Sequence, residues 1–158
     1  MRRSLPGLLF AAGGSVAAAA IGGVGSRRAP EVYARLDKPD WAPPGSVFGP
    51  VWTTLYTAIG AAGWRLWHRQ MEPVARIGLG LHATQLALNA AWPWAFFSAR
   101  SRTASLAVIV ALDATVAAEI VTAARVDRAA AGLLAPYLAW CLFATALTAS
   151  VSDPDGRH

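Results

Sequence analysis

The chain alternates between long apolar blocks and short polar segments. The blocks cover residues 5–25, 47–67, 74–97, 104–124 and 130–151. In helical conformation about 20 apolar residues cross the hydrocarbon core of a bilayer, and each block reaches that length. The pattern therefore predicts an all-α fold, an integral membrane bundle of five transmembrane helices, with residues 1–158 as a single transmembrane domain.

The first block has a small residue at every fourth position. Gly14, Ala18 and Gly22 form a stripe that lets a second helix approach closely within a membrane. A cleaved signal peptide would also explain two arginines followed by an apolar run of small residues. Because the run continues to Gly25 without a distinct polar region, the sequence favours a helix that is retained.

Residues 27–46 separate the first two blocks and are rich in proline. The three closely spaced prolines are Pro39, Pro43 and Pro44. Each fixes its own φ and pushes the preceding residue toward extended backbone. The segment is therefore predicted to be a stiff, non-helical connector, with Ser46 as the N-cap of the next helix. It delivers Trp41 to the mouth of that helix, where two interpretations remain open: an indole of the aromatic belt at the membrane surface, or part of a lid over a site.

The block over residues 74–97 carries one polar stripe on an otherwise apolar rod. Its members, three or four residues apart, are His82, Gln85, Asn89, Trp92 and Phe96. Residues at that spacing share one helix face. Polar groups at membrane depth must meet protein, water or a ligand. Hydrogen bonding between helices is favoured for His82, whereas for Gln85 and Asn89 a cavity lining is an equal alternative.

Two carboxylates fall inside the block over residues 104–124. Each costs roughly 2.5–3.5 kcal/mol when charged near the bilayer centre, so at least one should be protonated, paired or at a wet surface. Glu119 is expected to reach the membrane surface near Arg125 and Arg128. For Asp113, which lies deeper, a structural hydrogen bond is favoured over a proton relay.

Composition supports a membrane protein and excludes several other classes. Apolar residues make up 55% and charged residues 15%, with a mean hydropathy of +0.39, too apolar for an ordinary soluble domain. The net charge of +5 and pI near 10.3 do not indicate nucleic-acid binding, because the arginines lie at block ends, which suits lipid headgroups. The sequence has no catalytic triad, metal-ligand cluster or phosphate-binding loop, and its single cysteine, Cys141, allows no internal disulfide. No cofactor is expected to be required.

Three segments carry motifs of one known family. They read Lys38-Pro39-x-Trp41-x-Pro43-Pro44 through Phe48-Gly49-Pro50-Val51-Trp52-Thr53-x-Leu55-Tyr56, then Gln85-Leu86-x-Leu88-Asn89-x-x-Trp92, then Pro136-Tyr137-Leu138-x-Trp140. In this order they resemble the tryptophan-rich sensory protein family, also called translocator protein or peripheral-type benzodiazepine receptor (TspO/MBR). The resemblance runs from about Lys38 to Leu147.

The resemblance implies a five-helix membrane bundle, usually a homodimer, with a cavity closed by the loop over residues 27–46. Family members bind porphyrins such as protoporphyrin IX and haem, and benzodiazepine-type or isoquinoline ligands. The family pattern implies that the ligand-binding residues are Trp41, Trp52, Tyr56, Gln85, Asn89, Trp92, Trp140 and Ala144. Trp52 and Trp140 match the pair tied to porphyrin breakdown in bacterial relatives, and they are candidate catalytic residues only if that reaction occurs.

The last helix departs from the family pattern in one functionally relevant place. Some members bind sterols, and the Tyr and Arg of the animal sterol-recognition motif fall here at Ala149 and Asp153. This departure argues against sterol binding. The resemblance further implies an integral membrane protein of a bacterial cell membrane. Bacterial members of the family are linked to tetrapyrrole transport, sensing or light-dependent breakdown.

Three functions follow from these observations. The first is tetrapyrrole binding in porphyrin transport, sensing or scavenging, with metal-free porphyrin binding at least as well as haem because no His or Cys is clearly placed to ligate iron. The second is a light-dependent porphyrin-degrading enzyme, with Trp52 and Trp140 as redox participants. The third is a proton-coupled exporter of cationic drugs, suggested by Asp113 and Glu119, which leaves the Trp-Pro loop unexplained.

Overall fold

The computed structural model describes residues 4–153, and all regular structure among them is helical. Three elements follow one another at the N-terminal end: α1 (Ser4–Leu8), the π-helical η1 (Leu9–Gly13) and α2 (Gly14–Gly25). The long helices after them are α4 (Phe48–His68), α5 (Pro73–Pro93), α6 (Arg102–Ala124) and α7 (Arg128–Ser150). The shorter elements are α3 (Ala29–Arg35), the 3-10 turn η2 (Gly45–Val47) and the π-helical η3 (Trp94–Ser98). The two arginines before the first block, Arg2 and Arg3, lie outside the described residues.

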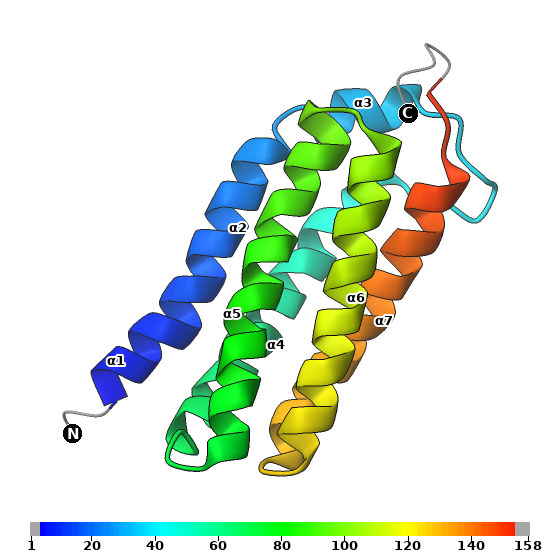
Figure 1. Ribbon diagram of the computed structural model, residues 1–158. Coiled ribbons are helices and arrows are strands. Elements are labelled where there is room, and N and C mark those ends of the chain that lie inside the picture. Colours follow the sequence, from blue (N-terminus) through cyan, green and yellow to red (C-terminus); the bar gives the residue numbers. More distant parts are fainter. Residues whose placement is uncertain (1–3, 154–158) are drawn as a thin grey trace.

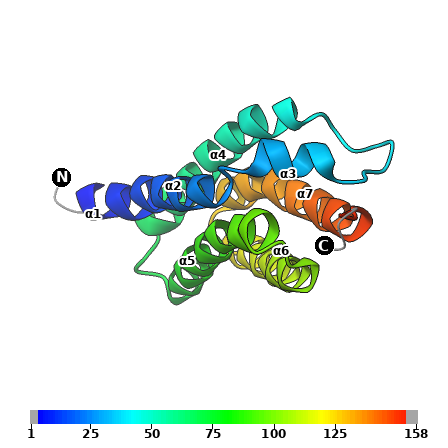
Figure 2. The ribbon, with the colours of Figure 1, turned by 90° about the horizontal axis from the view of Figure 1, so that it is seen from above.

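The long helices run side by side and form an elongated bundle (Figure 1). Helix α6 packs along both α5 and α7, while α4 packs along α7 and α2 along α5 (Figure 2). The main buried cluster draws on α4, α6 and α7, with fully buried Ile59, Leu66 and Leu134 among its members. The helix α3 and the connector lie over one end of the bundle, and the α4–α5 and α6–α7 turns lie at the other (Figure 1).

Small residues of the first block pack against α5. A Cβ added at Gly14 would lie 3.2 Å from Leu86 Cδ1, and one added at Gly22 would lie 3.8 Å from Ala90 Cα. Ala18, between them, is buried. The predicted close approach of a second helix is confirmed, and that helix belongs to the same chain.

Three segments of the described chain are long and apolar enough to cross a membrane. They are Leu5–Gly25, Arg102–Ala124 and Arg128–Ser150. Helices α4 and α5 are each 21 residues long, but tryptophan, arginine and histidine at one end of α4 and the polar stripe of α5 lower their hydropathy. The all-α membrane architecture is therefore confirmed, while the count of five crossings stays a prediction.

The prediction that the connector between the first two blocks is non-helical is wrong in part, because these residues contain α3 (Ala29–Arg35). Pro30 lies in the first turn of this helix, where a missing N–H leaves no hydrogen bond unmade. Glu31 Oε1 pairs with Arg35 Nη2 one turn later, at 3.0 Å. The proline-rich residues 38–44 do remain non-helical. Ser46 is also wrong as an N-cap, because it lies within η2 and no side chain caps α4.

Glu119 does not reach the membrane surface, contrary to the prediction. Its side chain and that of His82 are fully buried between α6 and α5, with His82 Nδ1 2.7 Å from Glu119 Oε1. A buried carboxylate needs a polar partner, and His82 provides one for Glu119 across the interface between the two helices. The interhelical hydrogen bond of His82 is confirmed. Asp113, half-buried, accepts a hydrogen bond from Thr145 Oγ1 of α7 at 2.6 Å, the structural role favoured for it.

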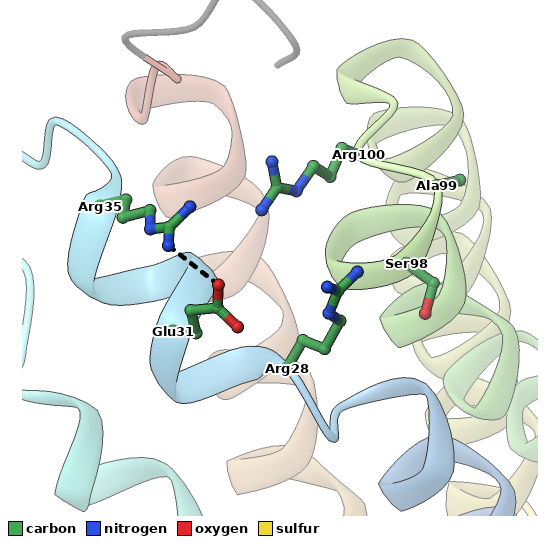
Figure 3. A pocket seen from close by; sticks show the side chains of 6 residues that line it. All are labelled: Arg28, Glu31, Arg35, Ser98, Ala99 and Arg100. Carbon is green, nitrogen blue, oxygen red and sulfur yellow. Dashed lines mark ion pairs between the residues drawn. The ribbon is translucent and has the colours of Figure 1, made fainter.

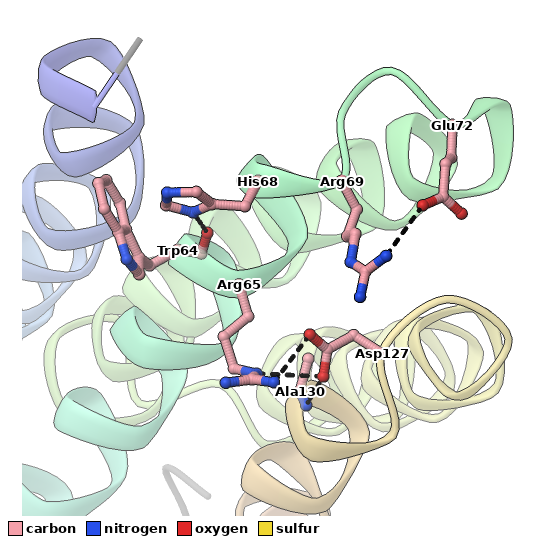
Figure 4. A network of polar contacts seen from close by, with 7 residues as sticks. All are labelled: Trp64, Arg65, His68, Arg69, Glu72, Asp127 and Ala130. Carbon is pink, nitrogen blue, oxygen red and sulfur yellow. Dashed lines mark hydrogen bonds and ion pairs between the residues drawn. The ribbon is translucent and has the colours of Figure 1, made fainter. Parts of the chain in front are cut away.

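An ion pair joins α4 to the turn before α7, at the end of the bundle opposite the connector (Figure 4). Arg65 of α4 lies 3.0 Å and 3.1 Å from the two carboxylate oxygens of Asp127, in the turn before α7. Asp127 Oδ1 also accepts a hydrogen bond from the Ala130 N–H at 3.0 Å and so caps α7. Burial alone would raise the pKa of Asp127, but these hydrogen bonds and the Arg65 charge outweigh it and hold the pKa below its ordinary value.

Candidate functional site

A continuous chain of side-chain hydrogen bonds joins α4, α5 and α7. Tyr56 Oη donates to Asn89 Oδ1 at 2.5 Å, and Asn89 Nδ2 donates to Tyr137 Oη at 2.8 Å. Tyr137 Oη in turn donates to Gln85 Oε1 at 2.9 Å. Gln85, Asn89 and Tyr137 are buried, where hydrogen bonds of such a network reinforce one another. The network fixes the orientation of both amides of the polar stripe.

The indole of Trp52 lies directly against this network. Its ring centroid is 5.5 Å from that of Tyr56 and 6.3 Å from that of Tyr137. Trp92, one turn beyond Asn89 on α5, stacks on Phe96 with a centroid separation of 4.9 Å. Aromatic rings at such separations contribute binding area and prefer tilted, offset or edge contacts. The network is thus bordered by the indole of Trp52, whereas Trp92 packs against a second buried cluster that contains Phe96 and Leu147.

A second aromatic group joins the connector to α7. Trp41 lies edge-on to Phe143, with ring centroids 5.8 Å apart. Phe143 is 5.1 Å from Trp140, which also meets Phe48 at the start of α4 at 5.8 Å. Trp41 is 50% exposed, so the indole covers α7 while one side remains open. Both interpretations of Trp41, a lid and an indole at the membrane surface, fit this placement.

Polar contacts within the connector fix its shape, and two backbone hydrogen bonds, Asp37 N–H to the Ser152 carbonyl at 2.9 Å and Ser152 N–H to the Asp37 carbonyl at 3.2 Å, join it to the segment after α7. Tyr33 Oη donates to the Pro43 carbonyl at 2.8 Å. Lys38 Nζ donates to the carbonyls of Tyr33 and Leu36, both at 2.7 Å. Burial raises the pKa of Tyr33, so its hydroxyl keeps the proton that it donates to the proline-rich turn.

Three of the predicted ligand residues carry a buried N–H donor that has no hydrogen-bond partner among residues 4–153. They are Gln85 Nε2, Trp92 Nε1 and Trp140 Nε1. A buried donor left unpaired costs about 1–3 kcal/mol. These donors could be satisfied by a molecule that is flat, apolar and equipped with a few acceptor atoms.

The structure brings some of the predicted ligand residues together and separates others. Trp52, Tyr56, Gln85 and Asn89 meet around Tyr137. Trp41 and Trp140 belong to the second aromatic group, and Ala144, one turn beyond Trp140, is buried on α7. The two cavities described for residues 4–153 lie elsewhere, and around Tyr137 the predicted ligand residues contact one another directly.

Tyr137 is the residue that the sequence reasoning missed. It contributes two of the three hydrogen bonds of the network and is fully buried. Its signal was present, because Tyr137 lies in the motif around Trp140 and shares a helix face with Cys141 and Ala144. Periodicity identifies such a face, but it does not show which buried hydroxyl meets which amide on another helix.

His82, the histidine inside the polar stripe, is not placed to ligate haem iron. His82 Nδ1 is engaged by Glu119, and a Cβ added at Gly63 would lie only 2.5 Å from His82 Nε2. The second ring nitrogen therefore faces packed backbone with no room for a macrocycle. Within residues 4–153, no three His, Cys, Asp or Glu residues are grouped to hold a metal ion.

Apolar helices of membrane-spanning length around a buried polar network define a helical membrane protein. The TspO/MBR family model matches residues 8–152, and the chain belongs to this family. It is 44% identical to the human translocator protein over 117 residues, covering 73% of this chain and 69% of that protein. It is 36% identical over 143 residues to the tryptophan-rich protein TspO of Chlorobaculum tepidum, covering 84% and 87%. The corresponding identity to the tryptophan-rich sensory protein of Cereibacter sphaeroides is 37% over 117 residues, covering 74% and 72%.

Proposed function

We propose that this membrane protein binds tetrapyrroles, protoporphyrin IX and haem among them, between α4, α5 and α7 beneath the connector. Its biological role would then be porphyrin transport, sensing or scavenging. The observation that carries the proposal is the network of Tyr56, Asn89, Tyr137 and Gln85, bordered by the indole of Trp52. Flat aromatic macrocycles suit an apolar site with few, fixed polar groups.

Entry of such a ligand requires the site to open, because its side chains contact one another directly. We expect the part of the connector around Trp41 to move, while two backbone hydrogen bonds between Asp37 and Ser152 hold the preceding part at the end of α7. Trp41 is half exposed and touches α7 through one ring pair. The three unpaired N–H groups then supply donors to ring nitrogens or carboxylates of the ligand.

Quenching of tryptophan fluorescence in detergent-purified protein tests the proposal. Protoporphyrin IX is expected to bind at least as tightly as haem, because His82, engaged by Glu119 and packed against Gly63, has no room to ligate iron. Gln85→Leu should weaken binding about tenfold, the loss expected for one buried hydrogen bond to a ligand. Thr84→Leu, on the exposed neighbouring face of α5, is the matched control. A strict requirement for iron, or equal affinities of both variants, would contradict the proposal.

Light-dependent porphyrin degradation is a second candidate function, favoured by the contact of Trp52 with two tyrosines. When an indole and a phenol are in contact, an electron can pass from one side chain to the other after either has been oxidised. Trp52→Phe and Trp140→Phe are the informative variants, and Trp64→Phe at the far end of α4 is the control. The rate of porphyrin absorbance loss under illumination should fall only in the first two; an unchanged rate removes them from the reaction.

Drug export coupled to protons has weaker support. Glu119 is fully buried against His82, and Asp113 is engaged by Thr145. A coupling carboxylate must reach both sides of the membrane in turn. Absence of cationic-dye efflux from vesicles that carry the wild-type protein would eliminate this function, and efflux retained in Asp113→Asn would exclude Asp113 as the coupling carboxylate.

The remaining features of the proposal follow the family. They are five membrane crossings, a bacterial cell membrane, benzodiazepine-type or isoquinoline ligands and a homodimer. The apolar groove of about 360 Å³ between α2 and α5 offers a face for the second copy. Ala87→Leu adds bulk in this groove and should shift the protein from dimer toward monomer, as measured by its mass in light scattering. Ala107→Leu, at an exposed position of α6, should not.

A further inference from the structure

A cavity of about 550 Å³ lies at the connector end of the bundle (Figure 3). Three separate segments line it: the turn before α3, the helix α3 itself, and the turn between η3 and α6. The lining residues are Arg28, Glu31, Arg35, Ser98, Ala99 and Arg100. None of them belongs to the tetrapyrrole site proposed above.

Guanidinium groups dominate the walls of this cavity. Arg28, Arg35 and Arg100 extend toward the same space (Figure 3), whereas Glu31 is the one carboxylate among the lining residues. Glu31 is already paired with Arg35 at 3.0 Å. Arg100 Nη1 forms an ion pair with Asp153 Oδ2 at 4.0 Å, and Arg28 has no ion pair within residues 4–153. The three guanidinium groups therefore face two carboxylates, Glu31 and Asp153, which leaves a net positive charge at the cavity.

The backbone holds Arg100 in a costly conformation. Its φ of 50° makes it the only non-glycine residue with positive φ in the described part of the chain. Such a conformation is sparsely populated for L-residues and tends to persist where a site depends on it. Ser98 Oγ donates to the Gly25 carbonyl at 3.2 Å, which ties this turn to the end of α2. The fixed turn aims the Arg100 guanidinium at the cavity.

The cavity lies beside the ends of two segments that are long and apolar enough to cross a membrane. One of these segments ends at Gly25, just before Arg28, and another begins at Arg102, just after Arg100. Segment ends of this kind lie at the boundary between hydrocarbon and headgroups. Arginine matches phosphate with two parallel hydrogen bonds and is attracted to anionic lipid. We propose that this cavity binds the phosphate of an acidic phospholipid headgroup, held by Arg28 and Arg100.

Native mass spectrometry of the full-length protein, released from mixed phosphatidylglycerol and phosphatidylcholine nanodiscs, tests this site. The protein is expected to retain phosphatidylglycerol in preference to phosphatidylcholine. The double variant Arg28→Gln with Arg100→Asn should lower that preference about tenfold or more, the loss expected for charge-assisted contacts. Asparagine at position 100 tolerates positive φ, so the turn is preserved. Arg76→Gln, an exposed arginine at the other end of the bundle, is the control.

Each other result overturns the assignment. Absence of a phosphatidylglycerol preference, or an equal loss in the Arg76 variant, reduces the site to general surface charge. Displacement of the lipid by an equal concentration of inorganic phosphate assigns the cavity to a free anion. Weaker protoporphyrin IX binding with unchanged lipid retention assigns it to porphyrin carboxylates instead.

A folding defect in the double variant does not prevent the test. Its tryptophan fluorescence melting curve is compared with that of the wild-type protein first. If the variant is unfolded, the wild-type preference is measured against salt, which must weaken it because the contacts are ionic and near the surface. A preference that does not change with salt overturns the proposal. Both readouts are independent of porphyrin binding, so failure of either proposal is recognised separately.

Discussion

His82 Nδ1 lies 2.7 Å from Glu119 Oε1, and both side chains are completely buried between α5 and α6. His82 Nε2 and Glu119 Oε2 have no hydrogen-bond partner within residues 4–153. Each side chain therefore depends on the other for its single polar contact. Breaking such a pair leaves one buried polar group uncompensated, which costs more than the pair itself gains over apolar packing.

Glu119→Leu should therefore lower the free energy of unfolding by about 3–5 kcal/mol. Glu119→Gln keeps an acceptor for His82 and should cost less than half as much. Thermal unfolding in detergent, followed by circular dichroism, measures both effects. The matched control is Glu72→Gln, because Glu72 forms an exposed pair with Arg69 at 3.5 Å (Figure 4), of a kind worth at most about 1 kcal/mol. Wild-type stability of Glu119→Leu would show that the pair is dispensable.

Gly63 provides the space that the His82 ring occupies. A Cβ at this position would lie 2.5 Å from His82 Nε2 and 2.9 Å from its Cε1. Gly63→Ala should therefore destabilise the fold by about 1–3 kcal/mol, because the buried ring has no free space to move into.

Gly132→Ala on α7 is the matched control for this substitution. A Cβ there meets no atom within 4 Å, so the higher helix propensity of alanine should leave stability unchanged or raise it by up to about 1 kcal/mol. Equal effects at both positions, measured by the midpoint of thermal unfolding, would contradict the packing argument.

The sequence predicts the helices well because period and length are local properties. The polar stripe on α5 even contains His82, Gln85 and Asn89, all of them now found buried. Their partners on other helices could not be predicted. Glu119 was expected at the membrane surface because arginines follow it along the chain, but helix rotation sets which face it occupies, and that depends on packing against α5. Helix α3 was missed for a different reason: it is only seven residues long, has Pro30 in its first turn and is followed by further prolines, so the segment resembles a non-helical connector.

Tyr137→Phe should disconnect the network at its centre. The substitution leaves Asn89 Nδ2 without its acceptor and Gln85 Oε1 without its donor, at about 1–3 kcal/mol for each buried group. Both thermal stability and protoporphyrin IX affinity should fall together. Tyr33→Phe, which removes only the hydrogen bond to the Pro43 carbonyl, should affect porphyrin on- and off-rates more than stability. Loss of stability without loss of affinity in Tyr137→Phe would separate the network from the binding site.

Asp127 gives the fold a dependence on acid pH. Its folded-state pKa is held below the ordinary value, burial being outweighed by the Ala130 N–H and Arg65. Its ionised form therefore stabilises the protein fully above the ordinary aspartate pKa of about 3.9, and this stabilisation is lost as the pH falls through the lower folded-state pKa. Asp127→Ala removes the cap of α7 as well and should cost about 1 kcal/mol at neutral pH.

Asp127→Asn separates charge from capping, because its side-chain oxygen still accepts from the Ala130 N–H. The variant should be less stable than the wild-type protein at neutral pH, since it lacks the charge that faces Arg65 at 3.0 Å. The difference should shrink below about pH 3.9, where the wild-type carboxylate begins to take up its proton. Unfolding midpoints measured from neutral to acid pH in one detergent give this difference directly. A constant gap between the two proteins across that range would mean that the charge of Asp127 contributes nothing to the fold.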